Sequence, residues 1–182
     1  SQVVFAHAGI DGQVEQYSVV ARDISQRRAA ERALAASEQR YRQLVQRLPA
    51  AAYTCDAQGY ITLYNEAAVA LWGRAPVLGQ DRWCGSWRMR LPGGESLAPD
   101  ESPMARVLTE GRSEREVEII IEREDGSRSS VLAFPEPIVD ASGAVAGAVN
   151  MLVDITDRKK AEQARDLLAA IVSSTDDAII SK

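Results

Sequence analysis

The sequence predicts an α+β fold in which one antiparallel sheet is flanked by helices. Short runs of alternating apolar and polar residues are separated by hairpin turns, such as Asp125-Gly126 and the stretch 140–143. Strong helix formers fill residues 23–48 before these runs, and a second Ala- and Glu-rich stretch follows them from residue 156. Strands that are joined by short turns pair in antiparallel fashion, so the sheet is expected to be antiparallel.

The first expected element is a helix over residues 23–48, which ends before Pro49. Its apolar side chains recur at alternating spacings of four and three, the heptad pattern of a coiled-coil seam. The seam consists of Ala30, Leu34, Ser37, Tyr41, Leu44 and Leu48. We expect a paired, dimeric helix with its main contacts at Leu34, Tyr41, Leu44 and Leu48. The alternative is that this face packs on its own domain.

Two short strands are expected next, at 52–55 and 60–64. Asn65 then stands at an N-cap position, where its side chain can accept from a backbone N–H at the start of a short helix. This helix is expected over 66–72, with Gly73 closing it.

Residues 74–99 contain several prolines and glycines and predict loops and short helical turns. Ser102-Pro103, a cap followed by proline at the first helical position, predicts a further helix that stops at Gly111. The apolar face of this helix is expected to consist of Met104, Val107 and Leu108.

Three further strands bring the expected sheet to five strands. The first shows the alternation of a half-buried strand, because Val117, Ile119 and Ile121 are interleaved with glutamates. Pro135 and Pro137 have no N–H to donate to a ladder, so they predict the end of the second strand or a bulge. These three strands are expected at 114–122, 129–134 and 145–153.

One strand-to-helix junction occurs twice in the chain. The stretch VARDISQRRAAE at 20–31 resembles LVDITDRKKAEQ at 152–163, and Asp23 recurs as Asp154, 131 positions later. A second echo, at an offset of 127, links residues 44–53 to the C-terminal end of the chain. We therefore expect the tail of one module, a whole module and the head of a third, as in a fragment of a longer tandem array.

Composition excludes several classes of protein. A net charge of −5 argues against a nucleic-acid surface, which usually needs a basic stripe. No apolar run approaches the roughly 18 residues that cross a bilayer, so no direct membrane contact is expected. The two cysteines, Cys55 and Cys84, provide neither a disulfide framework nor a metal-binding spacing. A reducing, cytoplasmic location is therefore expected.

The order of these elements resembles the PAS domain family of signalling modules. The resemblance rests on YITLYNEAAVALWG at 60–73 and VDITDRKKAE at 153–162, and it covers residues 48–156. Its most specific parts are Asn65 and the DITDR exit motif. It implies a five-stranded antiparallel sheet with small helices over one face, usually enclosing a pocket, and long flanking helices that pair as coiled coils in dimers. It also implies a tandem sensor region of a bacterial sensor histidine kinase or diguanylate cyclase.

This resemblance divides the chain into five expected segments. They are the last two strands of a preceding module at 1–24, a coiled-coil helix at 25–48, a complete PAS domain at 49–155, an exit helix at 156–173 and the start of a following module at 174–182. Neighbouring PAS modules and the output domain are the expected partners. The kinase or cyclase activity is expected outside this chain, which is itself not expected to be an enzyme.

The exit motif also has a physical interpretation of its own. Thr156 is expected to N-cap the outgoing helix, and Asp154 and Arg158 are expected to form an ion pair across its first turn. An exposed pair contributes less than about 1 kcal/mol, so its expected value is in fixing the exit angle. The alternative is an ordinary solvated charge pattern. The signal-relay residues are predicted to be Asp154, Thr156 and Arg158, with their counterparts Asp23, Ser25 and Arg27.

No constellation of residues predicts catalysis or a metal site. The single histidine, His7, lies in the incomplete first module, so a Ser-His-Asp set cannot be built in the central one. Gly93-Gly94 precedes no P-loop lysine.

No cofactor is expected, although an unknown small ligand stays open. Flavin-binding PAS members carry a reactive cysteine in an Asn-Cys-Arg-Phe type motif, whereas Cys84 lies in RWCGSW. Haem-binding members usually supply a histidine from the central helix, and ligation by Cys84 or Met104 is the remaining alternative. The candidate pocket lining is Tyr53, Tyr64, Trp72, Trp83, Trp87, Met104 and Leu108. These side chains can equally form the core and its lid.

The sequence thus predicts a non-catalytic sensory and dimerisation module that relays a conformational signal through its helices to a downstream output domain. The first alternative is a domain that binds a specific small molecule in its pocket. The second is a purely architectural spacer that holds two chains together.

Overall fold

A computed structural model describes the backbone of residues 2–8, 14–21 and 25–176, and the side chains of residues 25–172. The chain forms two compact units, Ser1–Leu44 and Val45–Lys182, which are described separately. Asp23, one of the predicted relay residues, lies outside the described residues. So do residues 177–182, which belong to the predicted start of a following module.

The first unit contains a hairpin and most of a long helix. Strands β1 (Gln2–Ala8) and β2 (Val14–Ala21) pair in antiparallel fashion. Helix α1 runs over Ser25–Gln46 and has no buried residue. The predicted seam is open to solvent: the exposed fractions are 70% for Leu34, 52% for Tyr41, 63% for Leu44 and, just beyond the helix, 44% for Leu48.

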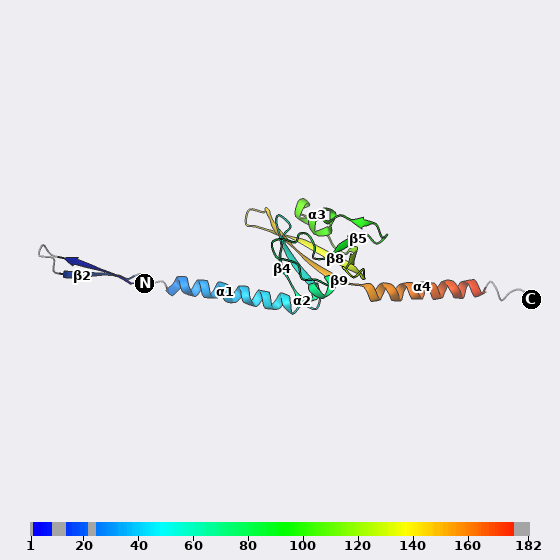
Figure 1. Cartoon of the computed structure of the whole chain (residues 1–182), viewed down its shortest axis with the longest axis horizontal. Coiled ribbons are helices and arrows are strands. Elements are labelled where there is room, and N and C mark those ends of the chain that lie inside the picture. The colour runs from blue at the N-terminus through cyan, green and yellow to red at the C-terminus, as the bar shows by residue number, and fades with distance from the viewer. Residues whose placement is uncertain (1, 9–13, 22–24, 177–182) are drawn as a thin grey trace, which may run out of the picture. The chain divides into compact units, whose positions relative to one another are not determined.

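The second unit is built on a seven-stranded sheet in the order β4-β3-β9-β8-β7-β5-β6, with every neighbouring pair antiparallel (Figure 1). The α+β class is confirmed, and the strand count is corrected from five to seven. The strands are β3 (Ala51–Asp56), β4 (Ile61–Tyr64), β5 (Arg88–Arg90), β6 (Ser96–Leu97), β7 (Val117–Glu122), β8 (Arg128–Val139) and β9 (Val145–Asp154).

The two unpredicted strands lie in the segment that was expected to be loops and short helical turns. Strand β5 pairs with β7, with Met89 opposite Ile121, and a tight turn returns the chain into β6. Only Met89 of β5 and Leu97 of β6 are buried. One apolar residue per strand is too short a pattern to show a period of two, so long-range pairing with β7 decides the structure here.

Strand β8 does not end at its prolines, contrary to the prediction. Pro135 pairs with Asn150 and Pro137 with Ala148, so the ladder with β9 continues to Val139. The other neighbour, β7, reaches only as far as Ala133. Residues two positions apart in a strand, such as Pro135 and Pro137, direct their backbone N–H and C=O groups to the same neighbouring strand. The missing N–H groups of both prolines therefore face the edge that β7 has vacated, where no ladder bond is lost.

The two short α-helices of the second unit begin and end with the expected capping residues. Asn65 accepts from the Ala68 N–H at 2.9 Å, and Ser102 accepts from the Ala105 N–H at 3.3 Å. Gly73 and Gly111 close the same two helices with φ of 72° and 67°, values that favour glycine. The helical elements are α2 (Glu66–Trp72), the 3₁₀ turn η1 (Pro99–Glu101), α3 (Pro103–Glu110) and α4 (Thr156–Asp176).

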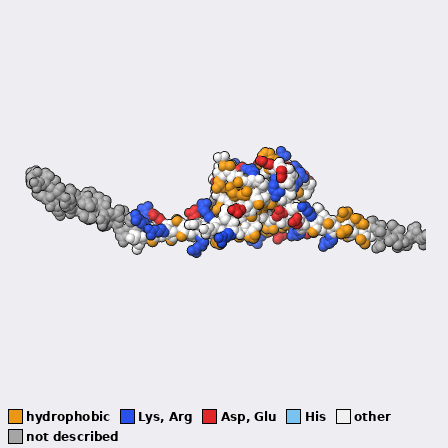
Figure 2. Space-filling model, turned by 60° about the horizontal axis from the view of Figure 1, so that its bottom comes forward, with side chains coloured by type: hydrophobic (Ala, Val, Ile, Leu, Met, Phe, Trp, Pro, Cys, Tyr) orange, Lys and Arg blue, Asp and Glu red, His pale blue; other side chains and the backbone are white. Residues whose placement is uncertain are grey.

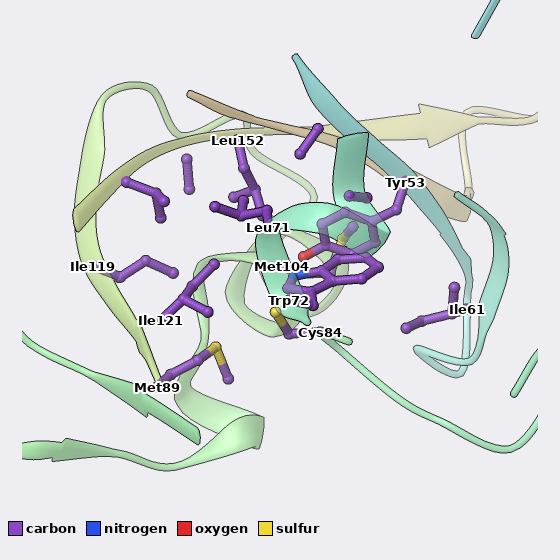
Figure 3. Packing of buried hydrophobic residues seen from close by; sticks show 14 of the residues in the cluster. Tyr53, Ile61, Leu71, Trp72, Cys84, Met89, Met104, Ile119, Ile121 and Leu152 are labelled. Carbon is purple, nitrogen blue, oxygen red and sulfur yellow. The ribbon is translucent and has the colours of Figure 1, made fainter. Parts of the chain in front are cut away.

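The core lies between one face of the sheet and helices α2 and α3. Trp72 occupies its centre, with its ring edge-on to Tyr53 at a centroid distance of 5.1 Å (Figure 3). Met104 and Val107 of α3 are fully buried, as their positions on the helix face predicted. Aromatic rings supply much of the buried area in a domain of this size, so Trp72 fills a large part of the volume between the layers.

Asn65 is fully buried and fixes three backbone segments at once. Its Oδ1 accepts from the N–H groups of Ala52 (3.0 Å) and Ala68 (2.9 Å). Its Nδ2 donates to the carbonyls of Ala50 (2.8 Å) and Val45 (3.2 Å). The sequence predicted only the bond within α2. The other bonds attach the end of α1 and the start of β3 to the same side chain.

Replacing Asn65 with Ala should lower the free energy of unfolding of the second unit by about 2–4 kcal/mol, because the cap is lost and buried backbone groups are left unpaired. The measurement is urea unfolding followed by tryptophan fluorescence, since all three tryptophans lie in this unit. Ser102→Ala is the matched control: it removes a single cap bond and should cost about 1 kcal/mol. Equal losses for the two variants would contradict the role assigned to Asn65.

Candidate functional site

The end of α1, Val45 and Gln46, belongs to the second unit and is fixed there by Gln46 as well as by Asn65. The Gln46 side-chain N–H donates to the Tyr64 carbonyl at 2.8 Å, and its Oε1 accepts from the Glu66 N–H at 3.2 Å. One side chain thus bridges the end of β4 and the first residue of α2. Sequence reasoning missed Gln46, because its partners lie about twenty positions away and leave no local pattern.

The outgoing helix is fixed to β8 by the repeated exit motif. The Ser130 N–H donates to the Thr156 hydroxyl at 3.0 Å, and the Ser130 carbonyl accepts from the Ile155 N–H at 2.9 Å. Thr156 is the first residue of α4, and its backbone N–H donates to the Asp154 carboxylate at 2.8 Å. The prediction that Thr156 caps the helix is therefore corrected: Asp154 supplies the carboxylate, and the Thr156 hydroxyl binds the neighbouring strand.

The predicted ion pair between Asp154 and Arg158 does not form within the part of the chain that the structure describes. Arg158 instead lies 3.7 Å from Glu162, one turn further along the helix. Residues four apart on a helix face each other, so this partner is geometrically closer. Lys159 forms a different pair, with its Nζ 2.9 Å from the Glu118 carboxylate of β7. Glu118 thus joins α4 to the sheet.

The two copies of the junction begin their helices at equivalent residues. Helix α1 starts at Ser25 and α4 at Thr156, the positions that the repeat aligns. Arg27 lies 2.8 Å from Glu31, just as Arg158 pairs with its own glutamate one turn on. The repeat in the sequence therefore corresponds to a repeat in helix start and in side-chain pairing.

An apolar groove of about 520 Å³ lies between the two junctions. Pro49 and Ala50 of the incoming segment line it, together with Ala67 of α2 and Val153 and Asp154 of β9. Arg123 borders it as well. Its Nε donates to the Leu71 carbonyl at 2.8 Å and its Nη2 to the Ser129 hydroxyl at 3.2 Å, so it braces the end of α2 against β8.

The seven predicted pocket residues do not surround one cavity. Tyr53, Trp72 and Met104 are buried in the core, and Tyr64, Trp83 and Leu108 are partly buried at its margin. Trp87 lies apart from this core, because it is 50% exposed. Its neighbour Trp83 packs instead on Gly59, where a Cβ would lie 2.1 Å from the indole. The interior is filled by side chains.

The sequence of this domain identifies the protein family to which it belongs. The sequence profile described as the PAS fold matches residues 45–160, which is more than half of the chain. The chain belongs to the PAS family. The match begins at the last turn of α1 and ends within the first turns of α4, so it includes both junctions of this PAS domain.

Solved structures share the PAS fold at low sequence identity. An RNA-binding light-oxygen-voltage receptor is 20% identical over 73% of this chain and 37% of its own length, with a TM-score of 0.51. A PAS domain from Colwellia psychrerythraea is 21% identical over 66% and 97% (TM-score 0.49), and that of Bordetella pertussis BvgS is 22% identical over 74% and 96% (TM-score 0.47). The chain thus spans little more than a third of the receptor. No curated protein sequence matches it.

A buried polar network crosses the PAS core beside its two thiols. The Tyr53 hydroxyl donates to the Trp83 carbonyl at 2.9 Å and accepts from Asn150 Nδ2 at 3.1 Å. Burial raises the pKa of the Cys55 thiol to about 12 and raises the pKa of the Cys84 thiol as well. Both side chains are therefore protonated at neutral pH, and a protonated thiol is a poor nucleophile and a poor metal ligand.

The described residues contain no group of three His, Cys, Asp or Glu side chains arranged to hold a metal ion. Among the same residues, no helix is both long and apolar enough to cross a membrane. His7 lies in β1, and its side chain is outside the described part of the chain.

Thr156→Val should deprive the partly buried Ser130 N–H of its acceptor and lower the free energy of unfolding by about 1 kcal/mol. Hydrogen exchange of the Ser130 amide should accelerate by more than that of other β8 amides, because the effect is local. Thr156→Ser keeps the hydroxyl and is the matched control. Unchanged exchange at Ser130 in the valine variant would show that the hydroxyl does not fix the exit.

Proposed function

We propose that this PAS domain relays a conformational change between α1 and α4. The observation that carries the proposal is that both helices join the sheet at the same end of neighbouring strands. Strand β3 begins at Ala51 and β9 ends at Asp154, and Ala51 pairs directly with Leu152. A displacement of one strand against the other therefore acts on both helix attachments at once.

The relay needs two arrangements of this junction whose balance a stimulus changes. The outgoing helix is attached to β8 through Thr156 and to β7 through Lys159. A small shift of β9 against these two strands would change the direction in which α4 leaves the domain. Asp154, Thr156 and Arg158 remain the proposed relay residues at this end, with Lys159 added by the structure.

Dimerisation through α1 is part of the proposal. Its heptad residues are 44–70% exposed in a single chain, and such a row of apolar side chains indicates a binding face. Helix α4 presents a similar row near the end of its described side chains, visible as hydrophobic side chains in Figure 2. These are Leu167, Leu168, Ile171 and Val172. A second chain that pairs with both helices would carry the relayed movement onward.

The recipient of the signal is proposed to be an output domain of kinase or cyclase type outside this chain, in the cytoplasm and next to further PAS modules. The repeated junction supports this arrangement, because a second module would attach to its helix in the same way. An architectural spacer is the competing function, and it requires no movement between β3 and β9.

A flavin in the interior does not fit this domain. Similar folds include a light-oxygen-voltage domain described with a flavin analogue. Here Trp72 is fully buried in the core, and a Cβ at Gly85 would lie 2.3 Å from its indole. The Cys84 thiol beside it is buried, and burial raises its pKa. No flavin chemistry is therefore part of the proposal.

Leu44→Asp should convert the dimer to monomer, because a charge would be buried in the proposed seam. Light scattering over a concentration series measures the change in mass. Gln43→Asp adds the same charge one residue away, outside the heptad seam, and should leave the dimer intact. A monomeric parent chain, or equal behaviour of the two variants, would rule out dimerisation through α1.

Gln46→Met should change hydrogen exchange not only at the end of α1 but also at the Ser130 and Thr156 amides, if the two junctions are coupled. Methionine keeps the length and helix propensity of glutamine and removes its two hydrogen bonds. Gln43→Met is the control. Changes confined to α1, β4 and α2 would favour the architectural spacer over the relay.

A further inference from the structure

A cleft separate from the filled core opens between the segment 74–87 and the β5–β6 hairpin, which is the part of the sheet that sequence reasoning missed. Its volume is about 310 Å³, at the lower end of the ~300–1,000 Å³ that small-molecule sites occupy. The Arg82 end of this segment is held to the domain, since Arg82 pairs with the backbone of Gln58 and Tyr60 bridges to Arg82.

Positive charge is concentrated in this cleft although the whole chain carries a net charge of −5. Arg74, Arg82 and Arg88 line it, and Asp81 is the single acidic residue of the lining, which leaves an excess of two positive charges. Asp81 is already paired: it accepts from Arg74 at 2.5 Å and from the Val77 N–H at 2.6 Å. Desolvation opposes ionisation of its carboxyl, but these bonds lower its pKa and keep it charged.

Two of the arginines are held in place by the protein. Arg74 is fixed by Asp81 through one Nη, so its other N–H groups remain for a ligand. The Arg82 guanidinium donates to the Gln58 carbonyl and lies over the Tyr60 ring at 5.0 Å and the Trp83 ring at 4.5 Å. Guanidinium groups fixed in this way lose little side-chain freedom when they bind an anion.

Arg88 supplies the charge that the protein leaves least compensated. Glu122 is the nearest carboxylate, and it is shared with Arg90 at 2.8 Å and Arg128 at 3.0 Å. Among the described residues, Arg88 comes no closer to a carboxylate than 3.9 Å, at Glu122, and its side chain is 60% exposed. One glutamate cannot neutralise three arginines. The entrance of the cleft therefore keeps a positive charge that attracts anions.

The rest of the lining is apolar or carries hydroxyl groups. Met89 and Leu97 are core residues that form part of the lining, and the Trp87 ring, half-exposed, borders the cleft. Ser86 and Ser96 add two hydroxyl groups. Apolar walls that hold a ligand body, together with a few polar groups that fix its orientation, are typical of small-molecule sites.

We propose that this cleft binds a small organic anion, a carboxylate or phosphate ester that carries one flat apolar group. The anionic head lies against Arg74 and Arg88, with Arg82 as a fixed positive neighbour, and the flat group lies on Met89, Leu97 and Trp87. Binding here involves none of the residues of the helix junctions, so it does not depend on the relay.

The test is a titration of the ¹⁵N-labelled chain with phenyl phosphate, benzoate, phenol and inorganic phosphate, followed by the amide signals of Ser86, Trp87 and Ser96 and the Trp87 indole signal. Saturable shifts with one or both aryl anions, with a Kd below about 10 mM, are expected. The aryl anion that binds more tightly, phenyl phosphate or benzoate, shows whether the head group is a phosphate ester or a carboxylate. Phenol and inorganic phosphate should each bind at least about tenfold more weakly, because each lacks one half of the ligand.

Arg88→Gln should weaken binding of the preferred aryl anion by about tenfold or more. Its side chain is exposed, so the fold should be unaffected, which the unchanged amide spectrum of the core would verify. Arg115→Gln removes another exposed arginine, which pairs with Glu136 and does not line the cleft, and it should leave the Kd unchanged. The proposal is overturned by an absence of saturable shifts, by equal binding of phenol, or by equal losses in both variants.

Discussion

A single buried amide, the side chain of Asn65, hydrogen-bonds to the end of α1, the start of β3 and the first turn of α2. These three segments present backbone groups of both kinds, N–H and C=O, to a side chain that is fully buried. Only a side chain with both a donor and an acceptor can satisfy them together, and an aspartate would lack the donor. This one amide therefore holds the residues at the end of α1, the start of β3 and the first turn of α2 together.

The two junctions are built from different chemistry, and this difference has physical consequences. Neutral amide groups of Gln46 and Asn65 hold the incoming helix. The outgoing helix is held partly by charge, through the Asp154 carboxylate and the Lys159–Glu118 pair. Salt screens partly exposed charge pairs and leaves neutral hydrogen bonds almost unaffected. Ionic strength therefore acts mainly on the exit of this domain, and any comparison of its conformations must hold salt constant.

Features with a local cause could be predicted from the sequence, and those that depend on distant partners could not. Caps such as Asn65 and Gly73, the alternation in β7 and the repeated DIS/DIT junction are written in neighbouring residues, so they were found. Gln46 and the β5–β6 hairpin depend on pairing across the fold, and Arg158 had a nearer partner in Glu162 than in Asp154. The sequence grouped Trp87 with the aromatic residues of the core although it is half-exposed, because aromatic residues at a core and at a surface look alike in sequence. Dimer formation through Leu34, Tyr41, Leu44 and Leu48 stays a prediction.

The proline pair in β8 also determines how copies of this domain can meet. Beyond Ala133 the outer side of β8 is a sheet edge, the kind of surface on which strands of other molecules add. Pro135 and Pro137 offer no N–H there, and the Pro135 carbonyl is already taken by the Glu114 N–H at 3.1 Å. A strand that approached this edge would find almost no ladder to join. This edge of the sheet is thereby protected against strand exchange and aggregation.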